Sequence, residues 1–312
     1  MTRAPSQPAG DSPLRSAAAA FWLRALFRLT TLAPDLVRAC KPLFIHLAHR
    51  FSRKIRSNTD ANGARILGPS STPAERRAFG LGVVSSFYDF VCDVGRSSRS
   101  SPEELFNHID EVHGLDAYRN ARALGKGAIV VTAHMGSFEV GLAALAQNEH
   151  KPIHVVFKRD RIDAFEQLRA SLRQRLNIRE APIDDGWTLW VRLRDVLHND
   201  EVVAIQGDRV MPGQKGARVP FLNGHVLLPS GPVKLALASG APIIPIFSIR
   251  TANGRIRIFI EDAIMVSPDG TDDPLTPALR KLAVVLAKYI AAYPQQWLVL
   301  DKAFCEDAPT LR

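Results

Sequence analysis

The chain has 312 residues, 46% hydrophobic and 23% charged, and a net charge of +9 at pH 7. This length allows one large domain with a substantial core, and Gly and Pro without any period exclude collagen-like and low-complexity proteins. Every apolar run is too short for an ordinary transmembrane helix, and the N-terminus lacks the order of a cleaved signal peptide, so we expect neither.

Cys40, Cys92 and Cys305 are odd in number and lie far apart in the chain. We therefore expect neither a disulfide framework nor a metal site, and a reducing compartment. Small buried side chains are the role expected of all three.

Residues 1–14 contain three Pro and one Gly, which predicts a disordered leader, and residues 15–124 are predicted as a helical region. Residues 1–60 hold ten Lys and Arg against three Asp and Glu. Between Phe21 and Phe51 apolar residues recur every three or four positions, which predicts a helix that Pro34 and Pro42 divide. Its apolar face bears Trp22, Leu26, Leu29, Ala33, Leu36, Cys40, Phe44, Leu47 and Phe51, and its opposite face is basic. Such a helix either packs on its own domain or lies on an anionic membrane, and both remain open.

The chain then changes from helical segments to alternating strands and helices. Helices are predicted at 73–95 and 102–124, and again at 137–148, 162–176, 187–198, 231–239 and 277–292. Strands are predicted at 128–133, 153–157, 202–206, 243–249 and 255–260, with a long loop at 207–229. We expect an α/β protein with a mixed central sheet flanked by helices, its core at 125–305 and a tail at 306–312.

The first chemical motif is His134 and Glu139, at the end of a buried strand and in the first turn of the next helix. A His can remove a proton from a hydroxyl when a carboxylate holds its other ring nitrogen. We therefore predict His134 as a general base that Glu139 orients, against the alternative of a structural His. Ser137 fits helix capping better than nucleophilic catalysis, because its surroundings lack the nucleophile-elbow pattern.

Two further strands end in charged residues. Lys158 and Arg159 follow one strand, and Asp208 and Arg209 follow another. These groups suit an anionic ligand, while a solvated charge run and a structural salt bridge are equally open. On a period of two, Lys158 should point away from the face that Arg159 occupies.

With these motifs in order, the sequence resembles the lysophospholipid acyltransferase superfamily, and most of all its bacterial lipid A late acyltransferase branch. Ser230 stands where glycerol-phosphate acyltransferases have Glu, which argues against that acceptor. The carrying blocks are His134 with Glu139, Phe157 with Arg159, Leu228-Pro229-Ser230-Gly231-Pro232 and Ala241-Pro242-Ile243-Ile244-Pro245-Ile246, joined by Asn58 and by Tyr293-Pro294-Gln295-Gln296-Trp297.

The resemblance implies the acyltransferase fold and an enzyme that moves a fatty acyl chain from an acyl thioester, on acyl carrier protein or coenzyme A, to a lipid hydroxyl. The expected acceptor is a lipid A precursor, with a phospholipid, aminolipid or glycolipid as the alternative. Arg159, Asp208, Arg209 and Gly231 would bind substrate, and the loop 210–229 would border the acyl groove.

The same resemblance implies a peripheral protein on the cytoplasmic face of the inner membrane, with an anionic lipid surface as partner. No cofactor and no metal are expected. A catalytically silent lipid-binding protein of this fold is the second alternative. Binding to nucleic acid is not expected, because the positive excess lies on an amphipathic helix and no nucleic-acid module is recognisable.

Overall fold

The computed structural model describes residues 25, 28–30, 32–97, 100–158, 170, 173–174, 176–210, 216–267 and 273–305. The strands are β1 (Ile109–His113), β2 (Ala128–Thr132), β3 (Ile153–Phe157), β4 (Ile178–Pro182), β5 (Val202–Gln206), β6 (Gly216–Phe221), β7 (Gly224–Pro229), β8 (Ile243–Arg250) and β9 (Ile256–Ile260). The helices are α2 (Pro34–Phe51), α3 (Arg53–Ile66), α4 (Pro73–Ser97), α5 (Pro102–Phe106), α6 (Leu115–Arg122), α7 (Phe138–Asn148), α9 (Trp187–His198), α10 (Gly231–Ser239) and α11 (Leu275–Ala292), with short 3-10 turns η1 (Ile183–Asp185) and η2 (Pro294–Gln296).

Within the described residues, a seven-stranded sheet has the order β1-β9-β8-β2-β5-β3-β4. The strands from β8 to β4 in this order are parallel. β9 is antiparallel to β8, and β1 is parallel to β9, so these two strands run the other way. The expected α/β architecture with a mixed central sheet is confirmed.

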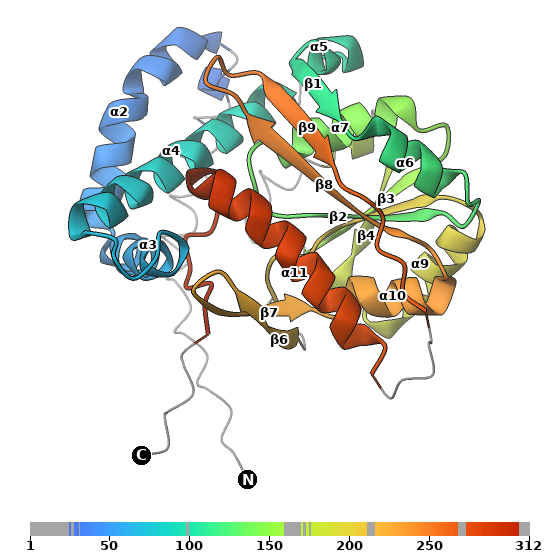
Figure 1. Cartoon of the computed structure of the whole chain (residues 1–312). Helices are drawn as coiled ribbons and strands as arrows, with labels where there is room; N and C mark the ends of the chain where they lie inside the picture. The colour runs from blue at the N-terminus through green and yellow to red at the C-terminus, as the bar shows by residue number, and fades with distance from the viewer. Residues whose placement is uncertain are drawn as a thin grey trace, which may run out of the picture.

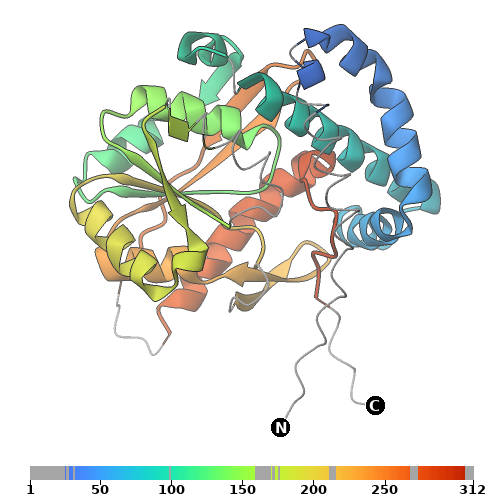
Figure 2. The same ribbon diagram turned by 180° about the vertical axis from the view of Figure 1, so that it is seen from behind.

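The sheet is covered on both faces, as Figures 1 and 2 show. β2 and β5 are short apolar runs, which is typical of parallel strands buried on both sides. Alternate residues face opposite layers: Ile129 and Val131 belong to the core formed with α9, α10 and α11. Ala128 and Val130 belong to the core formed with α5, α6 and α7.

The helices α2, α3 and α4 lie beside one end of this layered core (Figure 1). α2 turns Val37, Ile45 and His49 inward. It is held on α4 by an ion pair of 2.7 Å between Lys41 Nζ and Asp89 Oδ2 and by the Tyr88 hydroxyl, which donates to the Val37 carbonyl. α2 therefore packs through a narrow face.

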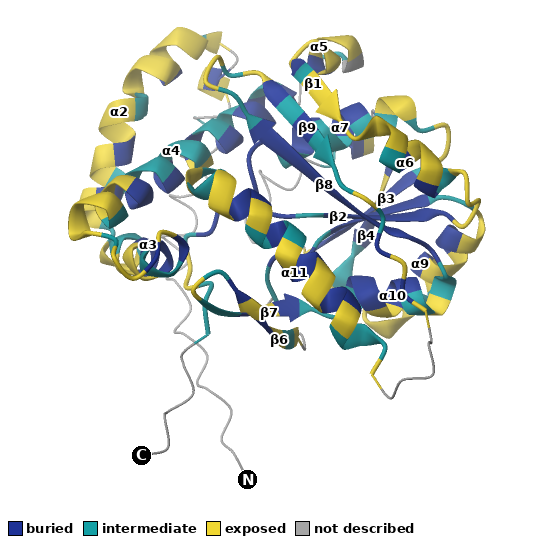
Figure 3. Cartoon of the chain, viewed as in Figure 1, coloured by how far each residue is buried: buried dark blue, intermediate teal, exposed yellow. Residues whose placement is uncertain are grey.

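The apolar face predicted for this segment points to solvent instead (Figure 3). Exposed apolar side chains, called the α2 stripe below, recur along α2 and the residues just before it. Its members are Leu29, Leu32, Leu36, Leu43, Leu47 and Phe51, with Leu43 at 63% and Phe51 at 77% exposure. The packing of α2 on its own domain is thus confirmed for its inner face, while the membrane role of the exposed face stays a prediction.

Pro42 does not divide the helix as expected. α2 continues through it from Pro34 to Phe51. Pro42 removes one backbone donor, but the carbonyl it would have reached belongs to exposed Arg38, where water can serve it. Pro34, at the first helical position, does begin the helix as a Pro at that position favours.

Among the described residues, α4 alone is long and apolar enough by composition to cross a membrane. In this protein 61% of its apolar window is buried, since α4 packs against α2, α3 and η2. Its apolar character is that of an internal helix in this fold.

Several predicted elements differ from the structure. The range 102–124 holds α5, the edge strand β1 and α6 rather than one helix, and the loop 207–229 contains the hairpin β6–β7. β4 was not predicted, because its sequence Ile-Arg-Glu-Ala-Pro is too polar for a buried strand and lies at the sheet edge. Cys40 is exposed, against the expectation of burial, whereas Cys92 and Cys305 are partly buried. The predicted leader 1–14, tail 306–312 and most of the predicted helix 162–176 lie outside the described residues.

Candidate active site

His134 lies just beyond the carboxyl end of β2, in a loop that contacts residues 296–298 and Ser248. The Leu298 N–H donates to the His134 carbonyl over 2.7 Å, and the Gly136 N–H donates to the Gln296 carbonyl over 2.9 Å. Gly136 has φ of +55°, and a Cβ there would lie 2.0 Å from the Ser248 carbonyl oxygen. Only glycine fits this close approach, so the turn that presents His134 depends on it.

Asp208 is the carboxylate that meets the His134 ring. Its Oδ1 lies 2.7 Å from His134 Nδ1, and the Trp297 indole N–H donates to Oδ2 over 2.8 Å. β2 and β5 are neighbouring strands, with Thr132 paired opposite Gln206. His134 and Asp208 each follow this pair by two residues. Parallel strands end at the same sheet edge, which brings His134 and Asp208 together.

Asp208 is buried and ionised. Burial raises the pKa of its carboxyl group, but His134, Arg209 and the Trp297 N–H together outweigh it and hold the pKa well below its usual range. An ionised carboxylate only accepts hydrogen bonds. His134 Nδ1 therefore carries the proton, and in the neutral imidazole Nε2 is the nitrogen that bears the lone pair.

Glu139, predicted to orient His134, occupies another environment. Its Oε1 lies 3.1 Å from Nη2 of Arg173, and both side chains are almost fully buried. The Arg173 guanidinium also stacks over the Phe157 ring at 4.9 Å. The pair lines a separate cavity of about 60 Å³ between α7 and the sheet. Asp208, rather than Glu139, therefore provides the contact to Nδ1, because α7 directs its second residue toward this cavity.

Ser137 stands at the N-cap of α7 but makes no capping hydrogen bond, contrary to expectation. Its hydroxyl donates to Asp93 Oδ2 of α4 over 2.7 Å. Asp93 is also ion-paired with Arg250 at the end of β8, and Phe90 of α4 stacks on Phe138 at 4.7 Å. α4 thus holds the residues that follow the His134 loop, Ser137 and Phe138.

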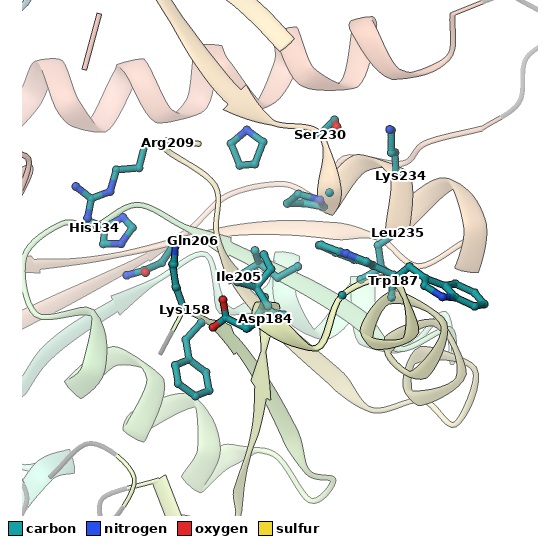
Figure 4. Close-up of a pocket in the computed structure, with 18 of the residues that line it drawn as sticks. His134, Lys158, Asp184, Trp187, Ile205, Gln206, Arg209, Ser230, Lys234 and Leu235 are labelled. Atoms are coloured by element: carbon teal, nitrogen blue, oxygen red, sulfur yellow. The ribbon is translucent and has the colours of Figure 1, made fainter. Parts of the chain in front are cut away.

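His134 lines a cleft of about 970 Å³ that is open at one side (Figure 4). This volume is at the upper end for small-molecule sites. Most of its wall is apolar, and its cationic side chains come from several elements. The apolar wall includes Phe87, Phe90, Phe138, Phe157, Ile183, Trp187, Trp190, Val191, Ile205, Leu235 and Leu298, and the cations are Lys158, Arg194, Arg209 and Lys234.

The remaining predicted site residues are placed as follows. Arg209 and Gly231 line this cleft, and a Cβ on Gly231 would lie 2.5 Å from the Trp190 ring. Lys158 also lines the cleft, whereas the sequence predicted that it faces away. Arg159 lies outside the described residues, so its binding role stays a prediction. Of the predicted loop 210–229, Pro229 lies on the cleft wall.

Sequence reasoning placed Asp208 at the correct sheet edge without pairing it with His134. The signal that would have paired them is the order of the strands, which periodicity does not give. Trp297 belongs to a motif that the sequence singled out, but nothing there indicated its bond to Asp208. Asp93 carried no recognisable signal. Among the described residues, no three His, Cys, Asp or Glu side chains are grouped to hold a metal ion.

A base held by a buried carboxylate, at the wall of a large and mostly apolar cleft, suits an enzyme that transfers acyl groups. The chain belongs to the bacterial lipid A biosynthesis acyltransferase family, whose model matches residues 12–305. The family expected from the sequence is confirmed.

Curated relatives carry the same kind of activity. The chain is 27% identical over 252 residues to a phosphatidylinositol mannoside acyltransferase of Mycobacterium tuberculosis, covering 79% of this chain and 76% of the relative. It is 24% identical over 250 residues to the phosphatidylinositol mannoside acyltransferase of Mycolicibacterium smegmatis, covering 79% and 78%.

Proposed function

We propose that this acyltransferase moves a fatty acyl group from an acyl thioester, on coenzyme A or acyl carrier protein, to a hydroxyl of a membrane glycolipid. The carrying observation is the hydrogen bond of 2.7 Å between His134 and buried Asp208 at the wall of the apolar cleft. Such a cleft suits an acyl chain, because burying each CH₂ contributes about 0.8 kcal/mol.

In the proposed step, Nε2 of His134 takes the proton of the acceptor hydroxyl while its oxygen attacks the thioester carbonyl carbon. Asp208 stabilises the imidazolium that forms and keeps the ring oriented. The C–O bond forms, the C–S bond breaks, and the leaving sulfur receives the proton from His134. The products are an ester and a thiol.

Two acceptors have support. The names of the relatives favour a glycolipid of the phosphatidylinositol mannoside kind. The family match favours a lipid A precursor, which is the second candidate. Both bring a sugar hydroxyl and a lipid tail to the enzyme, so the cleft and its cations suit either.

We further propose that the enzyme binds peripherally to the cytoplasmic face of the inner membrane. The α2 stripe exposes contiguous leucines and a Phe, and Arg38, Arg50, Arg53 and Lys54 lie exposed near it. Cytoplasmic leaflets are anionic and attract such cations by about 1 kcal/mol each. The stripe would insert between the lipids, with the cations at the headgroups.

The test is acyl transfer by the purified full-length protein from a long-chain acyl-CoA or acyl carrier protein thioester, with each glycolipid as acceptor. We expect ester product on one of them, and a loss of about 10²–10⁴ in rate for His134→Ala with little change in Tm. Wild-type turnover by folded His134→Ala would overturn the mechanism. Binding of thioester without turnover on either lipid would instead indicate a catalytically silent lipid-binding protein.

A further inference from the structure

Two hydrogen-bond donors on the wall of the cleft are buried and have no acceptor within the part of the chain that the structure describes. They are Nε2 of Gln206 and Nε of Arg209. A buried donor without an acceptor destabilises a fold by about 1–3 kcal/mol, so such groups are rare in proteins. In an active site such a group calls for an explanation, and an acceptor on a bound ligand supplies one.

Gln206 is the last residue of β5 and stands opposite Thr132 of β2. In Figure 4 its side-chain amide and the Arg209 guanidinium lie beside the His134 ring, from which the proposed reaction starts. Among the described residues, neither Gln206 Nε2 nor Arg209 Nε has a hydrogen-bond partner. Both come from one continuous segment, residues 206–209, which also carries Asp208.

The proposed reaction creates one hydrogen-bond acceptor that such donors would stabilise. As the hydroxyl oxygen attacks, the π electrons of the thioester carbonyl move onto its oxygen, which becomes an oxyanion until the C–S bond breaks. Preorganised donors aimed at this oxygen stabilise the transition state more than the ground state.

We propose that Gln206 is a catalytic residue, whose Nε2 donates to the thioester carbonyl oxygen and to the oxyanion that develops on it. Arg209 Nε is the second donor of the same pocket. This inference rests on the proposed thioester chemistry and adds to it the group that binds the reacting oxygen. A neutral amide fits this place beside His134. It can donate a hydrogen bond to the oxyanion, and it adds no charge next to Asp208.

The test compares wild type with Gln206→Leu, which keeps the volume and removes the donor, and with Gln147→Leu, the same change on an exposed turn of α7. Both long-chain acyl-CoA hydrolysis by water and transfer to the glycolipid are measured. For Gln206→Leu we expect kcat about 10²–10³ lower in both reactions, KM for acyl-CoA within threefold, and Tm unchanged or higher. Gln147→Leu should match wild type.

A kcat of Gln206→Leu within threefold of wild type would overturn the proposal. So would a raised KM at unchanged kcat, or a lower Tm with normal turnover by the folded fraction, since these indicate ground-state binding or a structural role. Hydrolysis without transfer to any glycolipid would reject the proposed acceptor while the Gln206 effect on hydrolysis stays measurable. Wild-type inactivity in both reactions would reject both proposals.

Discussion

Asp208 uses both carboxylate oxygens, one for the His134 ring and one for the Trp297 indole. This double attachment fixes the carboxylate in a single orientation, so the imidazole ring has one favoured tautomer. A carboxylate held by one bond would be free to rotate about its terminal torsion. Trp297 is therefore a positioning residue for Asp208, although it does not reach His134.

The first prediction separates Asp208 from Glu139. Asp208→Asn should lower kcat by about 10²–10⁴, because an amide cannot hold the same tautomer or stabilise the imidazolium. Glu139→Gln should lower Tm instead, because it weakens the charge partner of buried Arg173. Steady-state kinetics and thermal melting of both variants check this, and a larger kcat loss for Glu139→Gln at unchanged Tm would contradict it.

The second prediction concerns Cys92, which is partly buried on α4. Burial raises the pKa of its thiol to about 11, with Asp89 adding to the effect. Only the thiolate is nucleophilic, so its alkylation rate should rise about tenfold per pH unit from pH 8 to near pH 11. A free thiol in solution, with a pKa of about 8.5, levels off well before that.

Iodoacetamide labelling of the folded protein, followed by peptide mass spectrometry, measures this dependence. Exposed Cys40 should be modified first at every pH. Labelling of Cys92 as fast as Cys40 at pH 8 would be inconsistent with a buried thiol.

At the scale of elements, α2 divides its surface between two tasks. Its narrow inner face meets α4, and the α2 stripe is exposed to solvent. α4 in turn contributes Phe87 and Phe90 to the cleft. One helix thus lies between the proposed membrane face and the reacting groups, so a lipid leaving the membrane would reach the cleft along α4.

The third prediction tests this face. The triple variant Leu36→Ser, Leu43→Ser, Phe51→Ser should bind anionic vesicles about 10²-fold more weakly, since each insertion contributes about 1 kcal/mol. Val284→Ser, which changes a side chain 70% exposed on α11, is the control and should bind normally. Tm should not change in either protein, because these side chains are exposed. Cosedimentation with vesicles at low and high salt measures the binding. Equal binding by the wild type, the triple variant and the control would show that the α2 stripe does not contact the membrane.

For the whole molecule, sequence patterns predicted the elements that a single continuous run of residues specifies. β2, β3 and β5 are short apolar runs and were placed within a residue of their observed bounds. β1 and β4 are polar edge strands, and β6–β7 begins among Gly and Pro residues, so neither period nor composition marked them. The edge that carries His134, Asp208 and Arg209 was predicted, because each follows a strand. The bond between His134 and Asp208 was not, since it depends on β2 and β5 being neighbours.

The beginning and the end of the described chain are tied together behind the site. Asn58 and Asn62 of α3 donate to the carbonyls of Leu300 and Asp301, across 242 and 239 residues. Trp297 lies just before this join and reaches Asp208 across a further 89 residues. The entropic cost of closing such long loops grows slowly with loop length, by about 0.6 kcal/mol for each doubling of the length. Contacts so distant in sequence nevertheless form slowly. We therefore expect the helices and much of the sheet to form before a competent base, so that catalysis is among the last properties to appear as the chain folds.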